Sequence, residues 1–212
     1  METVWLFDLD NTLHDASPHI FPHINRSMTN YVMAQLGLEE TQASALREDY
    51  WHRYGATLLG LMRHHGTDPR HFLWHTHQFP DLPRQVIFDK ALAHALRRLK
   101  GRKIVYTNGP AQYAEAVLAA MGIRKYFEAV FAIEHAEFAP KPGMKSFRRL
   151  LRQFKLQPAR CVMVEDTAEN LRTARRLGMM TVLVSPKPAK PAWVDIKVRS
   201  VLELPRRLGS GI

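Results

Sequence analysis

Residues 4–13 read VWLFDLDNTL, a short apolar run that leads into two aspartates separated by one residue. The run lacks helical spacing, so it predicts a buried strand at residues 4–7. Alternate residues of a strand face the same side, which would bring Asp8 and Asp10 together. Two close carboxylates repel each other, and a chain tolerates them where a cation lies between them or where one reacts while the other holds a proton. A polar strand end that merely enters a turn is the alternative interpretation.

The chain beyond residue 102 alternates short apolar strands with amphipathic helices. We predict strands at residues 104–107, 129–133, 161–165 and 181–184, and helices at residues 111–121, 143–154 and 168–177. Such alternation is typical of βαβ units, in which helices cover both faces of a parallel sheet. The predicted fold class is therefore α/β with a Rossmann-like parallel sheet.

The segment after the first strand has a different pattern. Helical spacing dominates it, with predicted helices at residues 22–36, 39–54, 57–64 and 69–76. Pro80 and Pro83 mark the segment that returns from it. We therefore predict a catalytic core formed by residues 1–13 and 89–212, interrupted by an all-helical cap at residues 14–88.

Four short motifs occur in order along the predicted core. They are DLDNT at residues 8–12, TNG at residues 107–109, KP at residues 141–142 and EDTAEN at residues 165–170. In this order the chain resembles the haloacid dehalogenase-like phosphohydrolases, a superfamily with a Rossmann-like core. The first, second and fourth motifs fall at the ends of predicted strands. The third motif, KP, lies a few residues beyond the end of a predicted strand. In open α/β sheets, ligands bind outside those ends.

The resemblance implies a role for each core residue. Asp8 would be the nucleophile that forms an aspartyl-phosphate intermediate, and Asp10 the general acid that later deprotonates water. Lys141 would offset the charge on the Asp8–phosphoryl assembly, while Thr107 and the Asn108 amide would hydrogen-bond the transferring oxygens. Asp10 also argues against dehalogenation, because a departing halide needs no proton.

The same resemblance implies a Mg²⁺ cofactor. Its ligands would be Asp8, the main-chain carbonyl of Asp10 and Asp166, an oxygen set of the kind that Mg²⁺ prefers. Glu165 would assist Asp166, and Asn170 would orient it. Taken alone, Glu165 and Asp166 could merely charge the first turn of the following helix.

The substrate must be selected by the predicted cap, which resembles the helical lid that excludes water from such sites. Within it, residues 54–61 read YGATLLGL and are similar to a segment of the pyrimidine 5′-nucleotidases. We therefore expect a pyrimidine nucleoside monophosphate as substrate, with His14, Tyr54 and Thr57 as the candidate substrate residues. Tyr54 and Thr57 could face the nucleoside or could pack between the cap helices. His14 departs from that subfamily, since His14-Asp15 stands where it has Tyr-Pro. The alternatives are another small phosphomonoester, such as a sugar phosphate or phosphoglycolate, or a catalytically idle phosphate-binding module.

Composition narrows the expected partners. The net charge of +10 comes from the half beyond residue 96, where basic residues follow helical spacing and indicate solvated helix faces. Basic and aromatic residues do not interleave as in nucleic-acid binding, so we expect a small phosphorylated substrate instead. Cys161 is the one cysteine, and no signal-like or membrane-spanning apolar run is evident. These features favour the cytoplasm and no membrane partner.

Overall fold

The computed structural model describes residues 2–208, which divide into two compact units. Residues 2–15 and 86–208 form the core unit, and Ala16–Gln85 form the helical unit. An antiparallel bridge pairs Asp15 with Ile87, and the Asp15 N–H donates to the Ile87 carbonyl over 2.8 Å. The two chain segments that leave and re-enter the core unit are therefore hydrogen-bonded to each other.

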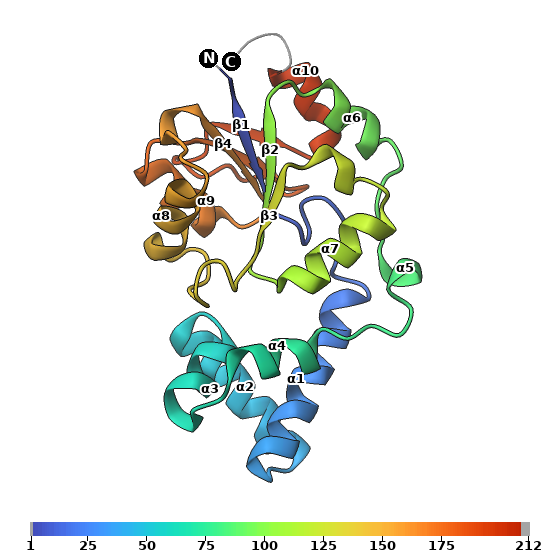
Figure 1. Cartoon of the computed structure of the whole chain (residues 1–212), viewed down its shortest axis with the longest axis vertical. Helices are drawn as coiled ribbons and strands as arrows, with labels where there is room; N and C mark the ends of the chain where they lie inside the picture. The colour runs from blue at the N-terminus through green and yellow to red at the C-terminus, as the bar shows by residue number, and fades with distance from the viewer. Residues whose placement is uncertain (1, 209–212) are drawn as a thin grey trace. The chain divides into compact units, whose positions relative to one another are not determined.

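The core unit is built on a six-stranded sheet with the strand order β3-β2-β1-β4-β5-β6 (Figure 1). Every neighbouring pair is parallel. The strands are β1 (Val4–Phe7), β2 (Arg102–Tyr106), β3 (Ala129–Phe131), β4 (Cys161–Glu165), β5 (Met180–Val184) and β6 (Ile196–Val198). The predicted α/β fold with a parallel sheet is confirmed.

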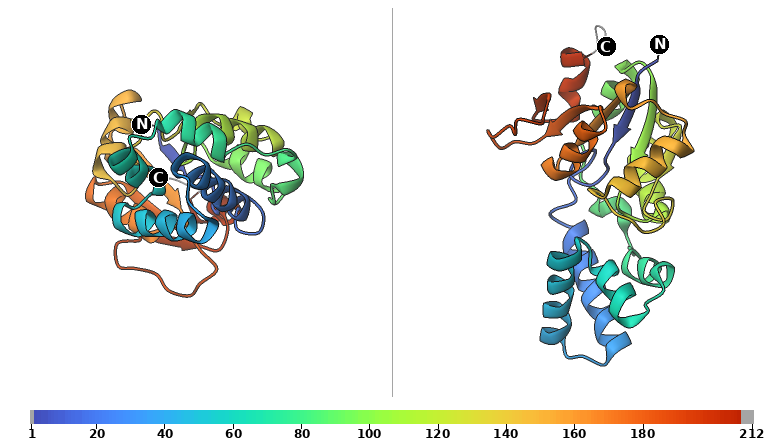
Figure 2. Two further views of the ribbon diagram at one scale, coloured as in Figure 1. Left: turned by 90° about the horizontal axis from the view of Figure 1, so that it is seen from below. Right: turned by 90° about the vertical axis from the view of Figure 1, so that its left-hand side faces the viewer.

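Helices cover both faces of this sheet (Figures 1 and 2). One face carries α8 (Met144–Gln153) and α9 (Ala168–Arg176), and the other carries α6 (Leu92–Arg98), α7 (Ala111–Ala120) and α10 (Leu204–Leu208). Short 3-10 turns complete the unit at η1 (Arg124–Tyr126), η2 (Pro158–Arg160) and η3 (Val201–Glu203). Beneath α8 and α9, Leu6 and Met163 pack with Phe147 in one buried cluster, all of them 0% exposed. Such burial on both faces explains why the strands are apolar throughout instead of alternating.

The edge strand β6 is an element that the sequence pattern did not predict, as are the helices α6 and α10. It has three residues and follows a segment with Pro186, Pro188 and Pro191, which lacks a strand-like pattern of its own. Pairing with β5 creates it, because Val182 aligns with Ile196 and Val184 with Val198. The helices and strands that were predicted are observed, and their ends lie within a few residues of the expected positions.

The regular elements of the helical unit are all helices. They are α1 (Ile20–Leu36), α2 (Glu40–Tyr54), α3 (Thr57–His65), α4 (Pro69–Thr76) and α5 (Leu82–Gln85). The last lies in the segment predicted as a plain linker. Gly60 lets α3 approach α2 closely, since a Cβ atom there would lie 2.2 Å from the Tyr50 ring. Within residues 2–208, no helix is both long enough and apolar enough to cross a membrane.

Candidate active site

Three of the predicted motifs meet at the carboxyl edge of the sheet. Phe7 is aligned with Val105 on one side and with Val164 on the other, so β1, β2 and β4 end within one residue of one another. Asp8 directly follows β1, Thr107 directly follows β2, and Glu165 ends β4. The Asp8 N–H donates to the Val164 carbonyl over 2.9 Å, which keeps the aspartate in register with the neighbouring strand.

Lys141 links these strand ends. Its ammonium group donates to Asp8 Oδ1 over 2.7 Å, to Glu165 Oε2 over 2.8 Å and to the Tyr106 carbonyl over 2.8 Å. All three donors of the ammonium are thereby used, and the Lys141 side chain is only 1% exposed. A lysine this deeply buried needs such partners, because an unpaired buried charge is costly. This lysine is therefore not a solvated loop residue.

Asn108 holds the loop that carries Lys141. Its side-chain oxygen accepts from the Lys141 N–H over 2.8 Å, and its side-chain nitrogen donates to the Lys141 carbonyl over 3.1 Å. These bonds occupy the side-chain amide of Asn108. The predicted hydrogen bond from the Asn108 amide to the transferring oxygens stays a prediction. Two bonds in opposite directions fix both residues.

Two threonines of the predicted motifs have defined hydroxyl partners. Thr12 Oγ1 donates to Asp8 Oδ2 over 3.0 Å, so the two carboxylate oxygens of Asp8 have different partners. Thr107 Oγ1 accepts from the Gly109 N–H over 2.9 Å, an arrangement in which the oxygen is the acceptor and the hydroxyl hydrogen can be given to another group. Thr12 was not among the predicted site residues, although it belongs to the first motif.

The buried acids carry an excess of negative charge over Lys141. Burial, followed by the negative charge of Glu165, raises the pKa of Asp8 to about 7. The positive charge of Lys141 partly opposes this rise. Burial likewise raises the pKa of Glu165 to about 7, and Lys141 opposes that rise. Burial alone would lower the pKa of Lys141, but Asp8 and Glu165 raise it above its ordinary value, so the amine stays protonated.

The same acids could hold a cation. Among His, Cys, Asp and Glu side chains of residues 2–208, the one group of three whose ligand atoms lie within 4.8 Å of one another is Asp8, Glu165 and Asp166. All their donor atoms are carboxylate oxygens, the ligands of Mg²⁺. Burial raises the pKa of Asp166 as well, so each member of the group would gain from an added positive charge. The donor set therefore fits Mg²⁺.

Asp10 lies apart from the lysine and has its own partners. Its Oδ1 atom accepts from Tyr113 Oη over 2.5 Å and contacts His14 Nε2 at 3.0 Å. Tyr113 was not predicted as a site residue, because its place on an amphipathic helix indicates only a core position. His14 was predicted to contact the substrate, whereas the structure buries its side chain completely against Asp10.

The remaining predicted residues lie elsewhere. Asn170 is buried in the first turn of α9, one turn after Asp166. In the helical unit, Thr57 is buried and donates its hydroxyl to the Arg47 carbonyl over 2.9 Å, a contact between α2 and α3. Tyr54 is partly exposed, and its hydroxyl lies 2.6 Å from Nε2 of the exposed His64. Thr57 thus has a packing role within its unit, and Tyr54 keeps an accessible surface.

Known proteins are similar to this chain in sequence and in fold. Phosphate metabolism protein 8 of Saccharomyces cerevisiae is 27% identical over 195 residues, which are 85% of this chain and 60% of the yeast protein. The chain thus spans less than two thirds of that relative. Fructose-1-phosphate phosphatase YqaB of Escherichia coli is 29% identical over 84% of this chain and 93% of its own length. A phosphatase crystal structure from Thermococcus onnurineus superposes with a TM-score of 0.71 at 20% identity, covering 100% of this chain and 99% of its own.

A family comparison covers most of the chain. Residues 3–178 match the model described as a haloacid dehalogenase-like hydrolase. The matched span includes Asp8, Asp10, Lys141 and Asp166, which are the acidic and basic groups at the carboxyl edge of the sheet. The chain therefore belongs to the haloacid dehalogenase-like hydrolase family.

Proposed function

We propose that this protein is a Mg²⁺-dependent phosphomonoester hydrolase that acts through an aspartyl-phosphate on Asp8. The observation that carries the proposal is that the two aspartates of the first motif have different hydrogen-bond partners. Asp8 is bonded to Lys141, while Asp10 is held in a separate environment. Two carboxyl groups whose surroundings differ can serve as nucleophile and as acid in one reaction.

In the first step, an Asp8 carboxylate oxygen attacks phosphorus and the bond from phosphorus to the bridging oxygen breaks. Asp10 gives its proton to that departing oxygen, so that an alcohol leaves instead of an alkoxide. Lys141 stays protonated beside Asp8 and offsets the negative charge that gathers there. The Thr107 hydroxyl, whose oxygen already accepts from Gly109, donates to a phosphoryl oxygen.

In the second step, water attacks the phosphorus of the aspartyl-phosphate. Asp10, now a carboxylate, takes the proton of that water, and the bond from phosphorus to Asp8 breaks. Inorganic phosphate leaves, and both aspartates return to their starting protonation states. Asn108 contributes indirectly, because it fixes the backbone that carries Lys141.

Asp8, Asp166 and the Asp10 main-chain carbonyl would hold Mg²⁺, in keeping with the all-oxygen donor set. Bound there, the ion supplies positive charge beside the phosphoryl group. Glu165 accepts from Lys141 on one oxygen and from the Thr167 N–H on the other. We assign it chiefly to holding the lysine in place.

For the substrate we propose a small sugar phosphate or a similar small phosphomonoester. The bacterial relative named as a fructose-1-phosphate phosphatase supports this class, since the chain spans 93% of its length. The names of the two relatives given above do not refer to a nucleotide, so the expected pyrimidine nucleotide becomes the second candidate substrate. Tyr54 favours that candidate, because its partly exposed ring offers a stacking surface. We also propose a cytoplasmic location, and the buried free thiol of Cys161 is in keeping with it.

The test is a phosphate-release assay on fructose 1-phosphate, phosphoglycolate, UMP and CMP, run with Mg²⁺ and with EDTA. We expect Mg²⁺-dependent turnover that disappears in EDTA, with the highest kcat/KM on fructose 1-phosphate or phosphoglycolate. Preference for UMP and CMP would favour the second candidate. Binding of substrate without any turnover would replace the enzyme proposal with the phosphate-binding module, and chloride release from a 2-chloro acid would indicate a dehalogenase.

A further inference from the structure

Two side chains contact the same oxygen of the Asp10 carboxyl group. Tyr113 Oη donates to Oδ1 over 2.5 Å from α7, and His14 Nε2 lies 3.0 Å from the same oxygen from the turn after β1. Tyr113 is 2% exposed and the His14 side chain 0%, whereas 18% of the Asp10 side chain is exposed. The two partners are therefore held by packing, while the carboxyl group itself can still be reached.

Within residues 2–208, the hydrogen-bond contact of the His14 ring is the one to Asp10. Its Nδ1 atom is buried and has no hydrogen-bond partner within residues 2–208. A buried histidine that only stabilised the fold would be expected to satisfy both ring nitrogens. Placing the hydrogen on Nε2 lets His14 donate to Asp10 and leaves a bare lone pair on Nδ1, which is less costly than an orphaned N–H.

Tyr113 acts as a donor for a simple reason. Asp10 Oδ1 is a carboxyl oxygen, and the Tyr113 hydroxyl has one hydrogen to give. Tyr113 lies 103 residues from Asp10 along the chain, so this hydrogen bond joins two elements that are remote in sequence.

We propose that Tyr113 and His14 are positioning residues that pin Oδ1 of Asp10 and so make Oδ2 the oxygen that carries the transferred proton. This inference rests on the proposed function, in which Asp10 is the general acid. In the first step the Oδ2–H bond breaks, the proton passes to the bridging oxygen, and the electron pair stays on the Asp10 carboxylate. With Oδ1 held by two donors, the carboxyl group cannot rotate its proton away from the leaving oxygen.

The first test is Tyr113→Phe, which removes one donor and keeps the ring. Proton donation matters for an alkyl leaving group and little for para-nitrophenolate. We expect kcat on an alkyl phosphate, such as fructose 1-phosphate or glycerol 3-phosphate, to fall about 10- to 100-fold, with para-nitrophenyl phosphate within about threefold. KM should change little for both. Tyr126→Phe, at a partly exposed tyrosine of η1, is the matched control and should leave both rates unchanged.

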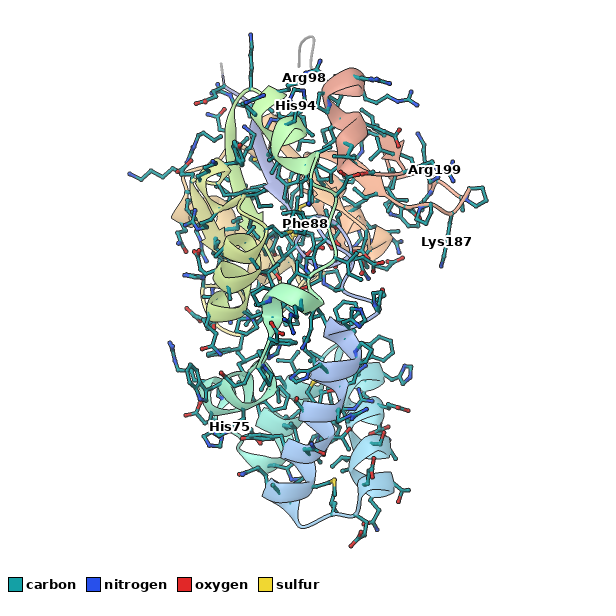
Figure 3. The ribbon with its side chains drawn as sticks, turned by 90° about the vertical axis from the view of Figure 1, so that its right-hand side faces the viewer. His75, Phe88, His94, Arg98, Lys187 and Arg199 are labelled. Atoms are coloured by element: carbon teal, nitrogen blue, oxygen red, sulfur yellow. The ribbon has the colours of Figure 1, made fainter. Side chains whose placement is uncertain are left out.

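The second test uses His14 and does not depend on how Tyr113→Phe folds. His14→Gln retains an N–H donor of similar reach, whereas His14→Leu keeps bulk and removes the donor. We expect His14→Leu to lose the alkyl phosphate rate selectively and His14→Gln to recover at least about half of that loss on a logarithmic scale. His94→Gln, at an exposed histidine of α6 (labelled in Figure 3), is the matched control.

A double-variant comparison separates positioning from general structural damage. If Tyr113 acts through Asp10, adding Tyr113→Phe to Asp10→Asn should change kcat by less than about twofold, since the acid is already absent. An equal loss on both leaving groups, or an undiminished loss in the Asp10→Asn background, would overturn the inference while leaving the proposed function intact. A folded wild-type protein without phosphatase activity would instead overturn the proposed function, and this inference with it.

Discussion

The core unit and the helical unit use polar side chains in opposite ways. In the core unit, buried charges meet across long stretches of chain, as when Lys141 bonds to Asp8 from 133 residues away. In the helical unit, tyrosine hydroxyls pair with histidine rings instead of with buried ions, as Tyr50 does with His65 and Tyr54 with His64. Both histidines of these pairs are exposed.

The difference has an energetic meaning. Burying an ion costs several kcal/mol unless its partners are well placed, so a fold accepts a buried charged cluster only where the whole tertiary structure supports it. Polar pairs with an exposed partner cost little and can be exchanged. We infer that the reaction chemistry resides in the core unit, and that the helical unit can vary to select substrates.

The largest effect is expected at Asp8. Asp8→Asn keeps the shape of the side chain but removes the attacking carboxylate, so kcat should fall by at least about 10³. The melting temperature should hold or rise, because a repelling buried charge disappears from beside Glu165. Phosphate release and thermal unfolding measure the two quantities. Asp81→Asn, at an exposed aspartate of the helical unit, is the control. Residual activity within tenfold of wild type would remove Asp8 from its assigned role.

Lys141→Met should give the opposite sign in stability. Removing the cation leaves the Asp8 and Glu165 carboxyls buried without it, and breaking one side of a buried pair costs about 3–5 kcal/mol. For a chain of this size we expect the melting temperature to drop by roughly 6 to 20 °C. Turnover should fall by about 10² or more, in line with the loss of charge stabilisation at a reacting group.

The matched control for this variant is Lys103→Met, at a part-buried lysine whose amine donates to the Leu99 and Gly101 carbonyls. It should lower stability without the loss of turnover. If Lys141→Met proves as stable as wild type, the buried cluster does not have the electrostatic balance described above.

The pH dependence of stability should reveal the same cluster. The folded-state pKa values of Asp8 and Glu165 are raised to about 7 from ordinary values of 3.8 and 4.5. A raised carboxyl pKa means that the folded protein binds its proton more tightly, so metal-free stability is lost as pH rises from about 4.5 through 7. Added Mg²⁺ should therefore raise the melting temperature more at pH 8 than at pH 5, by at least about 3 °C.

Calcium-free buffers with EDTA provide the baseline for this measurement, and Asp166→Asn the control, since it should weaken the Mg²⁺ response at pH 8. A Mg²⁺ response of equal size at both pH values would contradict the expectation that ionised Asp8 and Glu165 create the demand for a cation.

The smallest effect is expected in the helical unit. Tyr54→Ala removes a partly exposed ring without touching the buried charges of the core unit. We expect kcat/KM on para-nitrophenyl phosphate to stay within about threefold, while the ratio between UMP and fructose 1-phosphate shifts by roughly fivefold or more, since stacking on a ring is worth about 1–3 kcal/mol.

Tyr54→Phe is the control, because it keeps the ring and removes only the hydrogen bond to His64. A parallel loss on all substrates, with a lower melting temperature, would show that Tyr54 serves the packing of its own unit and not the choice of substrate.

Much of the fold and part of the site could be predicted from the residue pattern. Short apolar runs and amphipathic spacing indicated the parallel sheet, and motifs at strand ends indicated the edge where Asp8 and Glu165 meet. That inference works because parallel strands end at one edge of a sheet, whatever the loops between them do. The edge strand β6 escaped prediction, since its three residues form a strand only through pairing with β5.

The sequence by itself therefore determined the fold class and the kinds of chemical group at the sheet edge, because both follow from periodicity and from motif order. Only the tertiary structure decided which atoms those groups contact. It turned Asn108 toward the backbone of Lys141, set Thr12 on Asp8, and brought Tyr113 and His14 onto one oxygen of Asp10. Helical spacing tells which face of α7 is buried, but the neighbour on that face depends on how the helix packs against the turn after β1, and local sequence carries no record of that packing.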